Sequence, residues 1–288
     1  MNSFYGLSCN PFSKQAQEIP NAFQSNDFKV MQDRLGYLVD VRGIGVFTAP
    51  PGMGKTHAIR CFERSLNKNL YQTEYICLAT VSVPEFYAQF CGVLGLEPAY
   101  RKATMFKQIQ DQIYYYYKEK HKPLVLVIDE AQYLNSHVLD DLKLLMNFEY
   151  DSLNCFTLIL SGEPRLNITL SKAVNEALRQ RITVHYEFQG LDPDEVSRYV
   201  SHKLRAANGS DSIMMPDAMS ALVGACSGNP RIIDNIMTAA LTLGAQLKKA
   251  SIDADVIMGA VNELGFSRYP FPGALLREIF YIRQSLFL

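Results

Sequence analysis

Two segments, residues 49–56 and 123–130, constrain the fold of this chain more than any other feature. The first reads Ala-Pro-Pro-Gly-Met-Gly-Lys-Thr and lies between an apolar run and a helix-compatible stretch. A glycine-rich turn between a strand and a helix directs several backbone N–H groups at one point, as a phosphate-binding loop does. The second reads Pro-Leu-Val-Leu-Val-Ile-Asp-Glu, which is typical of a buried parallel strand that ends in two carboxylates.

The first segment predicts a site for ATP. Lys55 would reach the β- and γ-phosphates, and the Thr56 hydroxyl would bind Mg²⁺. The phosphate-loop pattern has glycine at its first position, where this chain has Ala49. Because alanine is small and two glycines follow it, we expect the departure to be tolerated. The residues predicted to bind the nucleotide are Pro51, Gly52, Met53, Gly54, Lys55, Thr56 and Asp129.

The second segment predicts the chemistry of the site. Ligands of open α/β sheets bind outside the carboxyl ends of the strands, which is where Asp129 and Glu130 lie. Asp129 would join Thr56 on Mg²⁺, and Glu130 would polarise the attacking water. An aspartate without a following glutamate would suit a protein that only binds nucleotide. Glu130 therefore favours hydrolysis of ATP to ADP and phosphate.

The remaining pattern indicates an α/β fold followed by helices. Helix-like stretches separate the strand-like runs, the rhythm of a parallel sheet. A strong helix start at 192–195 opens a region of helices only. We therefore expect an α/β nucleotide-binding domain at 1–190, a helical lid domain at 191–265 and a tail at 266–288, which is either packed on the helices or binds a partner. The five strand-like runs are 45–47, 75–79, 124–128, 156–160 and 183–188.

Composition narrows the class of protein. The chain has 288 residues, of which 48% are hydrophobic and 20% charged. Its net charge is −1, so it lacks the overall positive charge that would indicate binding to nucleic acid. Its six cysteines lack metal-binding spacing, which indicates reduced thiols. The sequence shows no signal peptide and no apolar run of membrane-spanning length. These features predict a cytoplasmic protein with no membrane segment.

Together, the phosphate loop, the Asp-Glu strand and the helical lid resemble an AAA+ ATPase. Within that superfamily, residues 1–264 resemble the ExeA-like ATPases. The motifs that carry this resemblance are Phe-Tyr-Gly-Leu at 4–7, Asn-Pro-Phe at 10–12, Asp-Glu-Ala-Gln at 129–132, Ser-Gly-Glu-Pro-Arg-Leu at 161–166, Gln-Arg-Ile at 180–182 and Gly-Asn-Pro-Arg at 228–231.

The resemblance implies further catalytic roles. Ser161 or Glu163 lies where the family has sensor 1, a polar residue that holds the attacking water. Arg179 or Arg181 lies where an arginine finger reaches the γ-phosphate of a neighbouring subunit in a homo-oligomer, either a ring or a filament. Arg231 matches sensor 2. For each arginine, a surface ion pair is the alternative. The segment 10–12 either packs near the adenine or forms an N-terminal strap.

The family has two branches, and they imply different partners. Secretion-system members carry a membrane span and a cell-wall-binding region, which are not found in this sequence. Soluble members, similar to MuB, TniB and IstB, bind duplex DNA as ATP-dependent oligomers and direct a transposase. The sequence favours the second branch. A nucleotide-gated ATPase of a secretion or other protein-assembly complex and a replication-type loader remain as alternatives.

A modest basic cluster at 98–122 is the candidate contact with DNA. Arg101, Lys102 and Lys107 are the preferred residues, because an oligomer would repeat such non-specific phosphate contacts along a duplex. A solvated helix face explains the cluster equally well. Four consecutive tyrosines at 114–117 could stack on bases, although packing is the better interpretation.

Overall fold

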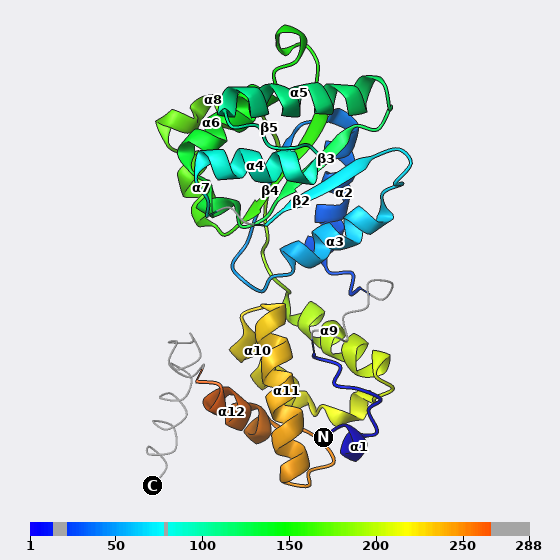
Figure 1. Cartoon of the computed structure of the whole chain (residues 1–288). Coiled ribbons are helices and arrows are strands. Elements are labelled where there is room, and N and C mark those ends of the chain that lie inside the picture. Colours follow the sequence, from blue (N-terminus) through cyan, green and yellow to red (C-terminus); the bar gives the residue numbers. More distant parts are fainter. Residues whose placement is uncertain (14–21, 78–79, 266–288) are drawn as a thin grey trace. The chain divides into compact units, whose positions relative to one another are not determined.

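The computed structural model describes residues 1–13, 22–77 and 80–265, and Figure 1 shows the course of the chain. The chain divides into two compact units. One, here called the α/β unit, spans Asn26–Gln189, and the other, the helical unit, combines residues 1–25 with the chain from Gly190 onward. The tail predicted at 266–288 lies outside the described residues.

The α/β unit is built on five parallel strands, as the sequence predicted. Their order in the sheet is β2-β3-β4-β1-β5, so the two strands that carry the main motifs, β1 and β3, flank β4. The carboxyl ends of β1, β3 and β4 therefore meet at one edge. The strands are β1 (Ile44–Thr48), β2 (Gln72–Ile76), β3 (Leu124–Ile128), β4 (Phe156–Gly162) and β5 (Ile182–Glu187).

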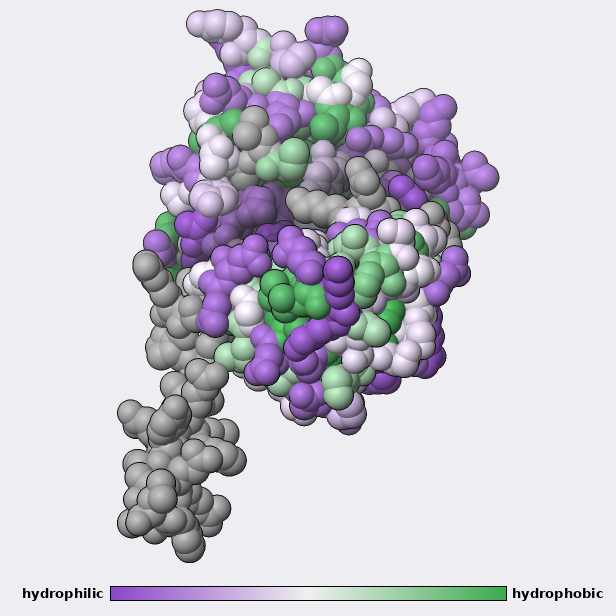
Figure 2. Space-filling model, turned by 90° about the horizontal axis from the view of Figure 1, so that it is seen from below, coloured by the Kyte–Doolittle hydropathy of each residue, from purple (hydrophilic) through white to green (hydrophobic). Residues whose placement is uncertain are grey.

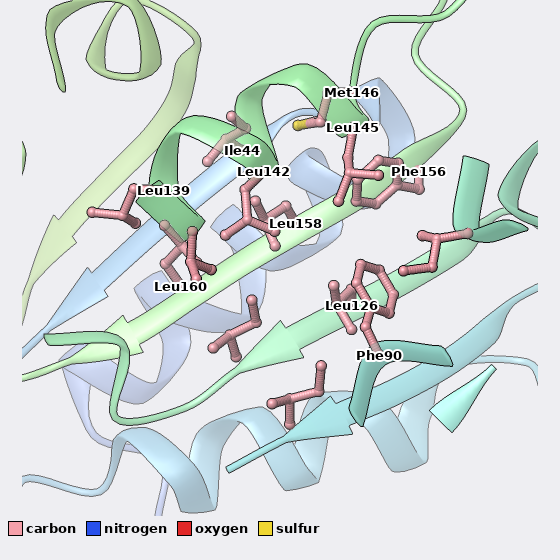
Figure 3. Close-up of a cluster of buried hydrophobic side chains, with 14 of the residues drawn as sticks. Ile44, Phe90, Leu126, Leu139, Leu142, Leu145, Met146, Phe156, Leu158 and Leu160 are labelled. Carbon is pink, nitrogen blue, oxygen red and sulfur yellow. The ribbon is translucent and has the colours of Figure 1, made fainter. Parts of the chain in front are cut away.

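Helices cover both faces of this sheet (Figure 1). Alternate residues of each strand point to opposite faces, so β3 places Leu126 among the helices of one face and Val127 among those of the other. Figure 3 shows part of the first cluster, where Leu142 and Leu145 lie over Leu158 and Phe156. The two layers bury all five residues of β1 and of β3, which explains the continuous apolar sequence of β3.

The helices of the α/β unit fall into these two layers by their core contacts. One face packs against α2 (Asn26–Val41) and α3 (Lys55–Ser65). The other packs mainly against α4 (Val83–Val93), α5 (Lys102–Lys118) and α6 (Ser136–Leu145). The shorter elements are α7 (Arg165–Leu170), α8 (Glu176–Arg179), η3 (Ala131–Tyr133), η4 (Glu149–Asp151) and η5 (Ala173–Asn175).

The helical unit begins at the predicted helix start. Asp192 caps α9 (Pro193–Ala206) by accepting a hydrogen bond from the Glu195 N–H at 2.7 Å, and the Glu195 side chain accepts one from the Asp192 N–H at 3.3 Å. The other helices are α1 (Asn2–Tyr5), α10 (Pro216–Cys226), α11 (Pro230–Gln246) and α12 (Ala254–Glu263), with the turn η6 (Asp211–Ile213).

The N-terminal segment packs in the helical unit, whereas the sequence analysis placed it in the α/β domain. Leu7 and Phe12 are buried in the helical core. The Tyr5 hydroxyl donates a hydrogen bond to the Lys249 carbonyl at 3.0 Å, and the Ser8 N–H donates one to the Ala207 carbonyl at 2.9 Å. The segment is thus a strap within the helical unit.

The face of the molecule in Figure 2 mixes hydrophilic and hydrophobic side chains. Exposed apolar residues of the helical unit include Met215 and Leu247. Throughout the described ranges, we find no helix with the length and apolar character needed to cross a bilayer.

Candidate nucleotide site

The two motifs that constrain the fold meet at the carboxyl edge of the sheet. The loop after β1 leads into α3, and the Thr56 hydroxyl in the first turn of α3 donates a hydrogen bond to the Asp129 carboxylate at 2.8 Å. Asp129 directly follows β3 and is 4% exposed. The structure therefore brings together the hydroxyl and the carboxylate that the sequence assigned to one site.

Backbone geometry explains the departure at Ala49. In the loop 49–56, which the structure describes in full, the residues with positive φ are Gly52 at 91° and Gly54 at 94°. Those positions favour glycine, whereas Ala49 is fully buried and donates its N–H to the Gly162 carbonyl at 3.1 Å. The Lys55 ammonium donates to the Ala49 carbonyl at 2.8 Å. An alanine thus meets the requirements of its position.

Asp129 accepts three hydrogen bonds. One oxygen, Oδ2, accepts from the hydroxyls of Thr56 at 2.8 Å and Tyr75 at 2.9 Å, and Oδ1 accepts from the Glu130 N–H at 3.0 Å. Burial, followed by the negative charge of Asp129, raises the pKa of Tyr75 well above its ordinary value. The Tyr75 hydroxyl therefore stays protonated and can donate to this carboxylate.

Tyr75 was not among the predicted site residues, because the predicted strand begins three residues later than β2. The prediction of a strand at 75–79 put Tyr75 at the start of the strand, at the opposite edge of the sheet. The observed strand ends at Ile76 and pairs Tyr75 with Val127 of β3, close to the carboxyl edge. The mainly aliphatic run after Tyr75 resembled a buried strand, whereas β2 lies at the sheet edge and is more polar.

Glu130 is exposed and has a left-handed backbone, with φ 53°. Its carboxylate accepts a hydrogen bond from the Gln132 side-chain amide at 2.6 Å, and the same amide's oxygen accepts one from the Glu163 N–H at 3.0 Å. Gln132 was not among the predicted site residues. Gln132 and Glu163 belong to motifs of the sequence, 129–132 and 161–166, and a contact between these two motifs is the signal that could have indicated Gln132.

The two candidates for sensor 1 have different surroundings. Ser161 is fully buried in β4, and its hydroxyl has no hydrogen-bond partner among the described residues. Glu163 is partly exposed, and its carboxylate forms an ion pair with Arg165 at 3.3 Å. Arg165 also lies over the Tyr133 ring, 4.2 Å from its centre. The Glu163 carboxylate is thus already engaged within the chain.

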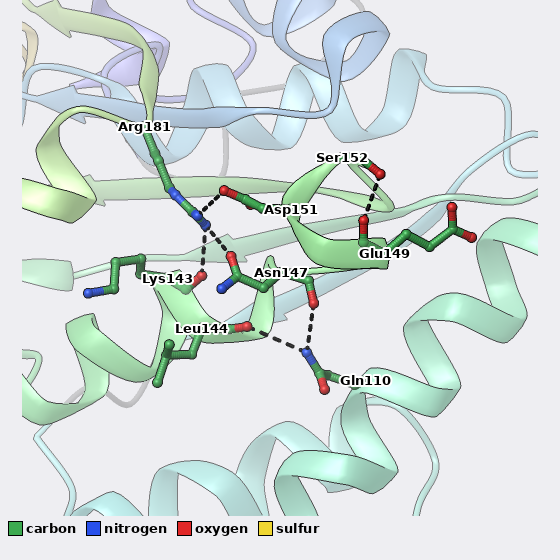
Figure 4. A network of polar contacts seen from close by, with 8 residues as sticks. All are labelled: Gln110, Lys143, Leu144, Asn147, Glu149, Asp151, Ser152 and Arg181. Atoms are coloured by element: carbon green, nitrogen blue, oxygen red, sulfur yellow. Dashed lines mark hydrogen bonds and ion pairs between the residues drawn. The ribbon is translucent and has the colours of Figure 1, made fainter.

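Arg181 is held by its own chain, as Figure 4 shows. Its guanidinium donates to the Lys143 carbonyl at 3.1 Å and the Asn147 side chain at 2.6 Å, and it forms an ion pair with Asp151 at 2.5 Å. Arg179 is exposed and pairs with Glu176 one turn earlier on α8.

Arg231 lies in the helical unit. It is the second residue of α11, and its side chain is exposed. Asn229 caps this helix by accepting hydrogen bonds from the N–H groups of Arg231 at 3.0 Å and Ile232 at 3.4 Å.

The basic residues proposed for DNA are at the N-terminal end of α5. Arg101 and Lys107 are exposed, whereas Lys102 forms an ion pair with Asp141 at 2.6 Å. Three of the four tyrosines at 114–117 pack against the core of the α/β unit, and Tyr115 is the most exposed of them. Packing is therefore the main role of this run.

The donor set fits Mg²⁺ bound together with phosphate oxygens. Over the described part of the chain, no group of three His, Cys, Asp or Glu residues could hold a metal ion by itself. Mg²⁺ in such sites takes one or two protein oxygens, with phosphates and waters completing its shell. Thr56 and Asp129, joined by a hydrogen bond beside the phosphate loop, supply such oxygens.

Comparison with known proteins gives this geometry a family context. The family described as AAA domain matches residues 39–170. General secretion pathway protein A of Aeromonas hydrophila is 31% identical over 245 residues, which cover 83% of this chain and 44% of that protein. The chain thus spans less than half the length of this curated relative.

Solved structures share the fold at low sequence identity. Cdc6p from Pyrobaculum aerophilum matches with a TM-score of 0.66 and 15% identity, over 88% of this chain and 70% of that one. The Aeropyrum pernix ORC1 protein in complex with DNA has a TM-score of 0.62 and 11% identity, over 88% and 68%. The Thermotoga maritima RuvB Holliday junction branch migration motor has a TM-score of 0.54 and 17% identity, over 82% of this chain and 69% of that one.

Proposed function

This chain is an AAA+ ATPase related to General secretion pathway protein A, and from that premise we propose that it hydrolyses ATP to drive assembly on a macromolecular partner. The observation that supports this most is the bond between Thr56 and Asp129 beside the exposed carboxylate of Glu130. A site that only bound nucleotide would not need Glu130.

Nucleotide binding would use the loop and the start of α3. The N–H groups of Gly52 and Gly54 and of the first turn of α3 would bind the phosphates, flanked by Pro51 and Met53. The Lys55 ammonium would leave the Ala49 carbonyl for the β- and γ-phosphates. Thr56 and Asp129 would hold Mg²⁺, which supplies neutralisation of phosphate charge when bound.

Glu130 would accept a proton from the attacking water, because it is the exposed carboxylate next to the Asp129 position. Ser161 is the better candidate for sensor 1, since its hydroxyl lacks a partner among the described residues and the Glu163 carboxylate has one. We retain both residues as candidates for the catalytic set.

Arg179 is the better candidate for a finger that acts on a neighbouring subunit. To reach a neighbouring subunit, Arg179 would have to break its surface ion pair with Glu176, whereas Arg181 would have to break three contacts. Arg231 would act as sensor 2 on the γ-phosphate. The role of the finger requires a homo-oligomer, as a ring or a filament.

At the level of the partner, we propose non-specific duplex DNA and a transposase, with the protein in the cytoplasm. Support comes from the resemblance to soluble transposition ATPases and from the exposed Arg101 and Lys107. The pairing of Lys102 with Asp141 weakens that position as a phosphate contact.

A role in a secretion or other protein-assembly complex is the second candidate. The 31% identity to a General secretion pathway protein over most of this chain favours it. In that case ATP turnover would respond to a protein partner and would be indifferent to DNA.

The experiment is ATP turnover with and without non-specific duplex DNA, alongside sedimentation with ATP. Lys55→Ala should abolish nucleotide binding, and Glu130→Gln should bind ATP without hydrolysing it and remain as an oligomer on DNA. If DNA changes neither ATP turnover nor oligomer assembly, the DNA proposal is refuted and the protein-assembly role is favoured. Normal hydrolysis by Glu130→Gln would refute the role of Glu130.

A further inference from the structure

The side chain of Gln132 links the Glu130 carboxylate to the turn between β4 and α7. Its amide nitrogen donates to Glu130 at 2.6 Å, and its amide oxygen accepts from the Glu163 N–H at 3.0 Å. Both ends of one side chain are therefore engaged, one at the proposed base and one at the end of the neighbouring strand.

The surroundings fix which way the amide of Gln132 faces. A backbone N–H can only donate, so the Gln132 atom that contacts the Glu163 N–H must be the oxygen. The nitrogen then faces Glu130, whose carboxylate oxygen accepts its hydrogen bond. The assignment of oxygen and nitrogen follows from these two partners and is not interchangeable.

Gly162 makes room for this arrangement. A Cβ atom at position 162 would lie 2.5 Å from the Gln132 amide oxygen and 3.3 Å from the Gln132 backbone nitrogen. A glycine at the end of β4 therefore permits the close approach of the amide. The contact of Arg165 with the Tyr133 ring, one residue after Gln132, joins the same two segments a second time.

The backbone of Glu130 is also restrained. Its φ of 53° is uncommon for a residue with a side chain, and its N–H donates to Asp129 Oδ1 at 3.0 Å. Unusual backbone conformations cluster at functional sites. With the backbone held by Asp129 and the carboxylate held by Gln132, both ends of Glu130 are restrained.

We propose that Gln132 is a positioning residue for ATP hydrolysis, which holds the Glu130 carboxylate and ties it to the β4–α7 turn. The inference rests on the proposed role of Glu130 as the base. It assigns to Gln132 an effect on the rate of hydrolysis and none on the binding of ATP, because its amide engages Glu130 and the Glu163 N–H and neither of the phosphate-binding residues Lys55 and Thr56.

The test compares Gln132→Met with Gln72→Met. Gln72 donates to Glu74 at 2.6 Å, so this bond has the same length and the same separation along the chain as the Gln132–Glu130 bond. Gln72 is the first residue of β2, at the end of the strand that is away from the nucleotide site. We expect Gln132→Met to lower kcat about tenfold or more, with KM and the affinity for a fluorescent ATP analogue within about twofold of the unmodified protein. Gln72→Met should leave kcat unchanged.

A double variant separates positioning from general damage. If Gln132 acts through Glu130, adding Gln132→Met to Glu130→Gln should change the residual single-turnover rate by less than about twofold. An additive loss would overturn the inference. So would a kcat of Gln132→Met equal to or above that of the unmodified protein while Glu130→Gln is inactive, and this outcome would leave the proposed function intact.

Gly162→Ala provides a second route should Gln132→Met fail to fold. The added methyl group would displace the Gln132 amide, so we expect the same fall in kcat with an unchanged KM. Hydrolysis that persists in Glu130→Gln, in contrast, would refute the proposed function itself, whatever Gln132 does.

Discussion

At the scale of single residues, the Asp129 carboxylate accepts hydrogen bonds from several donors at once. Its Oδ2 atom accepts from both Thr56 and Tyr75, so both of its lone pairs are in use. An oxygen that would also help to hold Mg²⁺ would have to lose one of these donors. Tyr75 is the donor that is not part of the phosphate loop, and it competes for this atom.

Tyr75→Phe should therefore lower the Mg²⁺ concentration needed for half-maximal ATP turnover, by about two- to fivefold. The raised pKa of Tyr75 keeps its hydroxyl protonated at working pH, so the competition operates throughout that range. Magnesium titration of the turnover rate measures the effect, with exposed Tyr37→Phe as the control. A higher Mg²⁺ requirement in Tyr75→Phe would show that the hydroxyl orients Asp129 instead.

The site could be predicted where each role follows from a local motif. Thr56 and Asp129 belong to strings whose chemistry fixes their place, after β1 and after β3, and parallel strands bring those places together. Tyr75 and Gln132 could not be predicted in this way. Their contacts depend on the register of an edge strand and on the close approach at Gly162, which no short string encodes.

At the scale of elements, the loop between α6 and β4 depends on Arg181. Three consecutive residues, Glu149, Tyr150 and Asp151, have positive φ of 46°, 59° and 67°, which is costly for residues with side chains. The guanidinium of Arg181 contacts Asn147, which precedes these three residues, and Asp151, which is the last of them (Figure 4). Tyr150 at the tip is fully exposed.

Arg181→Ala should release this loop. We expect amide exchange at 147–153 to accelerate about tenfold or more and cleavage by chymotrypsin after Tyr150 to increase. Arg179→Ala is the matched control, which should leave exchange unchanged while lowering ATP turnover by about 10³-fold if it supplies the finger. Loss of turnover in Arg181→Ala with an intact loop would reverse the assignment of the two arginines.

The helical unit contains a buried charge cluster. Asp234 accepts a hydrogen bond from the Tyr199 hydroxyl at 2.8 Å and lies 3.7 Å from the Lys203 ammonium. Burial lowers the pKa of Lys203, an effect that Asp234 partly opposes. Since the folded protein holds this proton less tightly than the unfolded chain, Lys203 detracts from stability at neutral pH and does so less as pH rises past its folded pKa.

Asp234→Asn should therefore destabilise the helical unit by about 3 kcal/mol at pH 7, because it leaves the buried ammonium without its counter-charge. The deficit should shrink as pH is raised, since a neutral amine needs no counter-charge. Thermal unfolding between pH 7 and pH 10 measures it, with exposed Asp255→Asn as the control. A deficit that is constant over this range would show that the hydrogen bond from Tyr199, not the charge, is what matters.

Most elements could be predicted because their sequence patterns agree with their surroundings. β3 was predicted to the residue, since an unbroken aliphatic run buried on both faces has clear ends. The start of α9 followed from a capping box that the structure contains. β2 was misplaced because the periodicity of a half-buried edge strand is weak.

At the scale of the whole molecule, the helical unit is assembled from segments that precede and follow the α/β unit. Phe12 is buried among its helices, while Phe4 in the same segment is largely exposed. The α/β unit between them is continuous, and its two ends are held together, because the Gln189 N–H donates to the Asp27 carboxylate at 3.1 Å.

Phe12→Ala should lower the free energy of unfolding of the helical unit by about 3 kcal/mol, as expected for removing a buried aromatic ring. Phe4→Ala should cost about 1 kcal/mol or less. Amide exchange in α9–α12 measures this directly, and exchange in the sheet serves as an internal reference. Equal effects of the two substitutions would show that the strap contributes little to the helical core.

This discontinuity sets an order of events during synthesis. The strap is synthesised before the α/β unit, whereas the helices that share its core are synthesised after that unit. At about 5–20 residues per second, the wait is roughly ten seconds or more. The α/β unit can fold in that interval, while Leu7 and Phe12 stay uncovered until the helices that share their core have been made.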